Sequence, residues 1–120
     1  MVARMISWGA LAIVAFDLLA SVASRVLGFP YGYATIGSWL IYATFGFIIG
    51  RRADVRTASA GVAVIAGVEA TVGWALSWAI GPGRPRDGMP SISVLMTTVV
   101  LVAASGAIIG AVAGVLARRQ

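Results

Sequence analysis

The stretch ISVLMTTVVLVAASGAIIGAVAGVLA, residues 92–117, decides the fold class because it contains no charged residue. About 20 helical residues cross a hydrocarbon layer that is ~30 Å thick. Three more apolar runs of similar length precede it, at 5–27, 31–50 and 58–80. The 120-residue chain is 60% hydrophobic and only 11% charged, unlike an average soluble domain. The sequence therefore predicts an all-α integral membrane protein with four transmembrane helices.

The connections divide these spans into two helical hairpins within a single domain, 1–120. A short link at 28–31 forces the first two spans to lie antiparallel, whereas the loop 81–91 is rich in Gly and Pro and cannot be helical. We expect a first hairpin over 1–50, a cytoplasmic connector over 51–57 and a second hairpin over 58–120. Because Asp17 interrupts the first apolar run, we expect a transmembrane helix there and not a cleaved signal peptide.

The two hairpins show an internal repeat. A shift of 52 positions aligns Asp17 with Glu69 and Pro30 with Pro82. After the longer second loop, GFIIG at 46–50 aligns with GAIIG at 106–110. These matches predict a duplicated hairpin whose copies run parallel, related by an axis along the membrane normal.

The net charge of +5 reflects arginines near the helix ends, which argues against a nucleic-acid-binding surface. Basic residues favour the cytoplasmic side of a membrane. One side of a four-span topology collects Arg4, Arg51, Arg52, Arg56, Arg118 and Arg119, and the other has Arg25, Arg84 and Arg86. This bias predicts an N-in/C-in orientation, most simply in a bacterial inner membrane.

The missing residue types exclude several kinds of chemistry. The chain has no Cys, His, Lys or Asn, so it cannot supply a thiolate nucleophile, a Cys/His zinc site, a Ser-His pair or a Schiff-base lysine. We therefore expect no enzyme activity, no catalytic residue, no metal and no cofactor.

Two carboxylic acids interrupt the apolar spans. Asp17 and Glu69 each lie about 17 Å along helices that run in the same direction, so both are expected near the bilayer centre. A charge at that depth costs at least ~2.5 kcal/mol, and we expect both acids to face protein, with at least one protonated at neutral pH. They are interpreted either as a proton or cation relay or as hydrogen-bonding groups that fix helix packing. A polar stripe at helical spacing accompanies them: Ser21, Ser24, Arg25 and Ser77.

Small and aromatic residues indicate how the helices pack and where they meet the headgroups. Glycines four residues apart allow two helix backbones to approach closely, and this spacing occurs at Gly46, Gly50, Gly106, Gly110 and Gly114. Aromatic side chains near span ends are typical anchors at the membrane surface, namely Trp8, Tyr31, Tyr33 and Trp78. The glycine faces are expected to pack within the chain or against another chain.

Two stretches resemble known transporters or channels. ALAIVAFDLLASVASRVLGF, 10–29, resembles the first helix of small multidrug resistance transporters, with Asp17, Arg25 and Gly28-Phe29 at the positions of that family's Glu, Lys and Gly-Phe. The acid differs, and Glu69 on the third span has no part in that pattern. FPYGYATIGSWLIYATFGFIIG, 29–50, resembles the second helix of fluoride channels, whose pore asparagine has no counterpart here. The chain is assigned to neither family.

The sequence leaves two functional hypotheses. The favoured one is a non-enzymatic accessory or assembly subunit that docks in a larger membrane complex through glycine-rich helix faces, because packing features outnumber reactive groups. The alternative is a small oligomeric proton- or cation-coupled transporter or channel that uses Asp17 and Glu69. The expected partners are the lipid bilayer and other membrane subunits or further copies of the chain.

Overall fold

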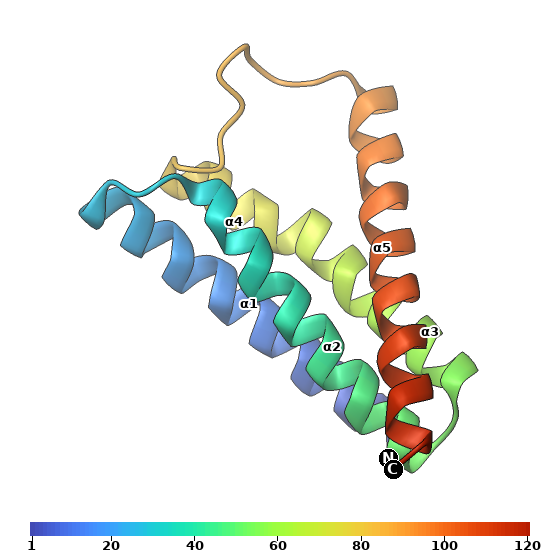
Figure 1. Cartoon of the computed structure of the whole chain (residues 1–120). Helices are drawn as coiled ribbons and strands as arrows, with labels where there is room; N and C mark the ends of the chain where they lie inside the picture. Colours follow the sequence, from blue (N-terminus) through green and yellow to red (C-terminus); the bar gives the residue numbers. More distant parts are fainter.

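The chain folds into four long helical passes, and the computed structural model describes all residues, 1–120 (Figure 1). The first pass is α1, Val2–Leu27, and the second runs from a short 3-10 turn, η1, Tyr31–Tyr33, into α2, Ala34–Arg52. The third joins α3, Val55–Val68, through η2, Glu69–Gly73, to α4, Trp74–Ile80, and the fourth is α5, Ile92–Arg118. All four passes are long and apolar enough to cross a membrane. The prediction of an all-α chain with four helices long and apolar enough to span a membrane is confirmed.

The turns follow from local residues. Helix α1 ends at Gly28, which adopts the left-handed conformation with φ 78° and donates its amide to the Ser24 carbonyl. The connector is shorter than the predicted 51–57, because α2 continues to Arg52 and α3 already begins at Val55. Asp54 explains this early start, since its side chain accepts a hydrogen bond of 2.7 Å from the Thr57 amide and caps the helix. Both chain ends lie together at one end of the molecule (Figure 1).

Helix α5 joins the rest of the molecule through its second half. A Cβ atom added to Gly50 would lie 2.5 Å from the Gly114 Cα, and one added to Gly46 would lie 2.8 Å from the Gly110 Cα. Only glycine permits backbones to come this close. Gly46 and Gly50 of α2 therefore pack against Gly110 and Gly114 of α5 inside the chain, whereas Gly106 packs against α3.

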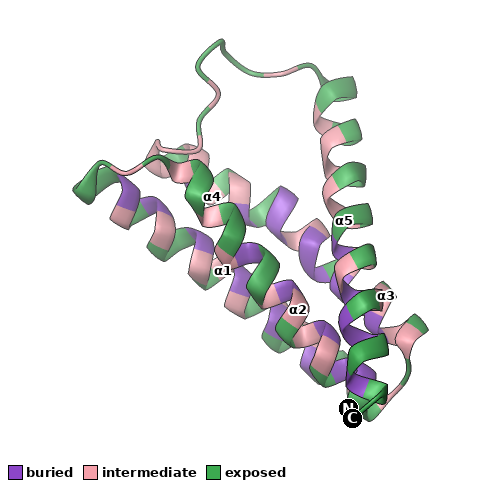
Figure 2. Ribbon diagram, in the orientation of Figure 1, coloured by how far each residue is buried: buried purple, intermediate pink, exposed green.

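The first half of α5 is covered by little protein. No residue from 92 to 105 is buried, and α5 contacts α2, α3 and η2 but neither α1 nor α4. Figure 2 shows this half as exposed and half-exposed ribbon that leans away from the other helices. The main apolar core surrounds Ile13, Tyr42, Val62, Ile65 and Ala66 and does not include this half of α5 as buried residues.

The third pass is not a regular α-helix. Glu69–Gly73 forms a π-helical segment, η2, which carries wider hydrogen-bonded turns than the α-helix on either side. Short π-helical segments are often found at functional sites. This segment contains the acid predicted for the third span and packs against α1 and α5. Its Glu69 side chain reaches α2 through hydrogen bonds.

Candidate functional site

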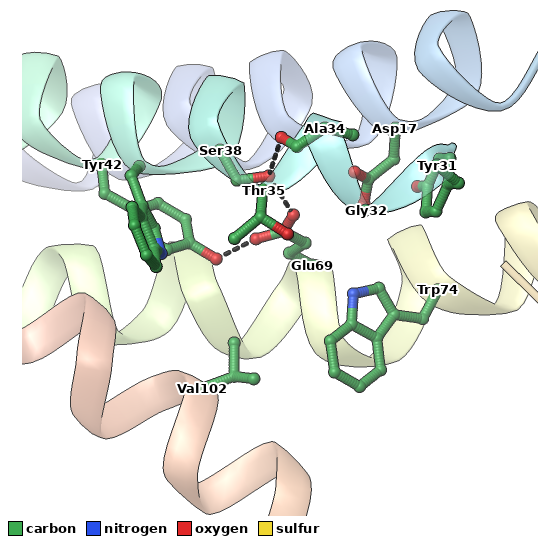
Figure 3. Close-up of a pocket in the computed structure, with 11 residues that line it drawn as sticks. Asp17, Tyr31, Gly32, Ala34, Thr35, Ser38, Tyr42, Glu69, Trp74 and Val102 are labelled. Carbon is green, nitrogen blue, oxygen red and sulfur yellow. Dashed lines mark hydrogen bonds between the residues drawn. The ribbon is translucent and has the colours of Figure 1, made fainter. Parts of the chain in front are cut away.

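A cavity of about 200 Å³ lies among the helical passes at the level of the two acids. Its walls come from all four passes, with α5 contributing only Val102. Figure 3 shows the carboxyl groups of Asp17 and Glu69 directed into the same space from different helices. The lining residues are Asp17, Tyr31, Gly32, Ala34, Thr35, Ser38, Trp39, Tyr42, Glu69, Trp74 and Val102.

Glu69 is held by two hydroxyl groups of α2. Its side chain is only 6% exposed. The Ser38 hydroxyl donates to Oε1 at 2.5 Å, and the Tyr42 hydroxyl donates to Oε2 (Figure 3). Both carboxyl oxygens of Glu69 therefore accept a hydrogen bond from the same neighbouring helix.

Asp17 has a different environment, although it is even less exposed, at 2%. Its Oδ2 atom has no hydrogen-bond partner and lies directly against Gly73, where a Cβ atom would collide with the carboxyl group. The Tyr31 hydroxyl points toward Asp17 in Figure 3. Both acids line the same cavity. One acid is thus fully hydrogen-bonded, whereas the other retains a free oxygen beside the cavity.

Sequence reasoning missed the α2 side of this site. Tyr31, Thr35, Ser38 and Tyr42 recur at spacings of four, three and four, which places them along one helical face. All four line the cavity. This second polar stripe was a readable signal, and it identifies the hydroxyl groups that accompany the acids.

The residues of the predicted polar stripe lie on α1 and α4 and make different contacts. Ser21 is fully buried and its hydroxyl has no partner, whereas the Ser24 hydroxyl donates to the Phe29 carbonyl at 2.7 Å. Arg25 reaches across to α4 and donates to the Ile80 carbonyl at 2.8 Å. Ser77 is buried and donates to the Trp74 carbonyl in its own helix. Only Ser21 leaves a free hydroxyl in the interior.

The predicted aromatic anchors also differ from one another. Trp8 and Tyr33 are 62% and 67% exposed, so their rings are free to contact lipid. Trp78 is half-buried in α4. Tyr31 differs from an anchor of the headgroup region, because its half-buried ring lines the cavity and its hydroxyl turns inward.

The arrangement is suited to holding a proton or a single cation. Donors to both oxygens fix the position of the Glu69 carboxyl group, whereas Oδ2 of Asp17 has no partner. The chain forms no group of three or more His, Cys, Asp or Glu side chains that could hold a metal ion. The polar groups of the cavity are instead two acids and four hydroxyl side chains, with one carboxyl oxygen of Asp17 left without a partner.

No protein-family model, curated protein or solved structure matches this chain. The functional interpretation therefore depends on the geometry of this site.

Proposed function

We propose that the protein is a small proton- or cation-coupled transporter of the bacterial inner membrane, with Asp17 and Glu69 as the groups that bind the coupling ion. One observation carries this proposal: two acids from separate passes reach one cavity inside a bundle of membrane-spanning helices. Acids inside a membrane cost free energy and commonly mark ion pathways.

The different surroundings of the acids give them different roles. Glu69 accepts from Ser38 and Tyr42, so its carboxyl group is held in a fixed position. Asp17 keeps Oδ2 free and serves as the group that takes up and releases the proton. When one acid is ionised, its charge disfavours ionisation of the other, so the pair exchanges one proton or cation at a time.

The cavity is proposed to open toward one side of the membrane only. It extends to Tyr31 and Gly32, at the start of the second pass, which lies on the outer side in the proposed N-in/C-in orientation. Below it, Ile13 and Ile65 are fully buried in the apolar core. Because the inner side is sealed, the structure fits a transporter that alternates between two conformations better than it fits an open channel. The proposed duplication of the hairpin accounts for the acids lying at matching depth.

Pulses of pH on protein in a solid-supported membrane test this proposal. A proton that binds inside the bilayer moves charge across part of the membrane and gives a transient current. The assay therefore does not require the transported solute to be known. We expect a current from the native chain that is lost in Asp17→Asn and Glu69→Gln. Asp87→Asn, which changes an exposed loop acid, is the matched control and should retain it. Currents of equal size in all three variants would refute the proposal, and parallel pulses of Na⁺ and K⁺ distinguish a proton from a metal cation.

A second candidate, an accessory or assembly subunit of a larger membrane complex, is favoured by the surface of α5. Its first half exposes large apolar side chains and has little protein cover, so it offers a face for another membrane helix. The most exposed are Ile92, Met96, Val100 and Leu101. The glycine faces proposed for docking pack within the chain, which leaves this half of α5 as the surface for a partner.

The second candidate is tested by extracting the protein gently with its native lipids and measuring the mass of the particle that contains it. A stable complex with a different membrane protein, lost when Val100 is changed to Trp, supports it. The matched control is Leu11→Trp, a similarly exposed apolar position on α1. A chain that always migrates alone or only with its own copies contradicts the accessory-subunit function.

A further inference from the structure

A second, larger cavity of about 870 Å³ lies at the end of the molecule opposite the chain termini. It is formed where α1 ends, where α4 ends and where the following loop begins. Three of its lining residues are arginines, Arg25, Arg84 and Arg86. The only acidic residue of that loop, Asp87, is exposed and does not line the cavity. The cavity therefore carries a positive charge that its own walls do not balance.

Two of these arginines are held in place by neutral partners. Arg25 donates through Nη1 to the Ile80 carbonyl at 2.8 Å. Arg84 donates through Nε and Nη2 to the Trp78 carbonyl at 3.1 and 2.9 Å. A backbone carbonyl fixes the position of a guanidinium group but does not neutralise it. Since a guanidinium has five N–H donors, both side chains keep donors for a ligand.

Arg86 adds a third positive charge to this fixed pair. Its side chain is exposed, lines the same cavity and donates no hydrogen bond within the chain. Three guanidinium groups around one space repel each other unless an anion joins them. Guanidinium donors match the oxygen geometry of phosphate, which they bind in pairs.

We infer that this cavity binds a phosphate-type oxyanion through Arg25, Arg84 and Arg86. The shared ligand chemistry is a tetrahedral phosphate group, carried by an anionic phospholipid headgroup or by free inorganic phosphate. Phe29 and Pro30 also line the cavity at the end of the first apolar pass, which is the depth of headgroups. The site is separate from the acids, and Tyr31 alone lines both cavities.

Binding to the purified full-length chain in a neutral detergent tests this inference, with two ligand arms. Native mass spectrometry compares phosphatidylglycerol with phosphatidylcholine, and thermal unfolding compares inorganic phosphate with chloride at equal ionic strength. The decisive variant is Arg86→Gln, because this side chain makes no internal hydrogen bond whose loss would disturb folding. Arg119→Gln removes an exposed charge at the opposite end of the molecule and is the matched control.

We expect Arg86→Gln to raise the Kd of the bound phosphate group about 5-fold, the change typical of losing one exposed charge pair. Arg119→Gln should change it less than about 2-fold on the same scale. Selective binding of phosphatidylglycerol identifies a lipid site, and stabilisation by phosphate alone identifies a free-anion site. Equal effects of the two variants, or no preference in either arm, would overturn the inference. Loss of binding in Arg25→Gln supports it only if Arg86→Gln also weakens binding.

Discussion

Replacing Tyr42 by Phe removes one of the two hydroxyl groups that bind Glu69 while keeping the aromatic ring in the core. Tyr42 is 2% exposed and Glu69 is 6% exposed, so the hydrogen bond lies almost entirely within the protein. An unsatisfied buried acceptor costs about 1–3 kcal/mol, and side-chain hydrogen bonds between membrane helices average ~0.6 and reach ~1.7 kcal/mol. We therefore expect Tyr42→Phe to lower the free energy of unfolding by about 1–2 kcal/mol.

The assay is reversible unfolding in mixed micelles, followed by tryptophan fluorescence. Tyr33→Phe is the control, because that tyrosine is 67% exposed and should change the free energy by less than about 0.5 kcal/mol. A double-mutant cycle of Tyr42→Phe with Glu69→Gln isolates the interaction between the two side chains. If the cycle gives no coupling energy, or if the two Phe variants are equally stable, the reasoning about this hydrogen bond is refuted.

Three further substitutions test packing and capping. Gly73→Ala should lower the free energy of unfolding by about 1–3 kcal/mol, since its Cβ would collide with the Asp17 carboxyl, whereas Gly67→Ala, with nothing within 4 Å, should be neutral or stabilising. Gly50→Ala should lower the free energy of unfolding by a similar ~1–3 kcal/mol, because the atoms in the way belong to the Gly114 backbone and α5 must move away from α2. Disulfide cross-linking between cysteines introduced in α2 and α5 measures that separation. Hydrogen bonds from the backbone at the start of α3 hold the pKa of Asp54 below its ordinary value of 3.8. The Asp54 carboxylate therefore stabilises the fold fully above pH 3.8, and this stabilisation is lost as the pH falls through the lowered pKa. Asp54→Ala should therefore reduce the melting temperature at neutral pH, with the difference narrowing in acid, and a constant difference would contradict this.

The helices were predictable because each depends on a local pattern. Uncharged apolar runs such as 92–117 indicate membrane spans without reference to other segments. The residues Gly28 and Asp54 mark helix boundaries through their own backbone and capping preferences. Even so, the connector was predicted too long, because the capping role of Asp54 was not recognised.

The contacts of the site were harder to predict because they join residues far apart in the chain. Asp17 and Glu69 were identified from their cost in lipid, but the partners of Glu69 lie 31 and 27 positions away, at Ser38 and Tyr42. Such a pairing depends on the rotation of two packed helices, which no single apolar run determines. The π-helical segment likewise has no sequence signal of its own, since its residues are compatible with an ordinary α-helix.

The close glycine contacts between α2 and α5, Gly46 with Gly110 and Gly50 with Gly114, have a mechanical consequence. They fasten α5 only at its second half, while the first half continues into the loop 81–91. A small tilt about this pivot leaves the glycine contacts intact and moves the far end of the helix through a larger arc. Val102 lies just beyond the pivot and is the one α5 residue in the cavity wall. Tilting α5 would therefore widen or close the space around the two acids without breaking the packing that holds the bundle together.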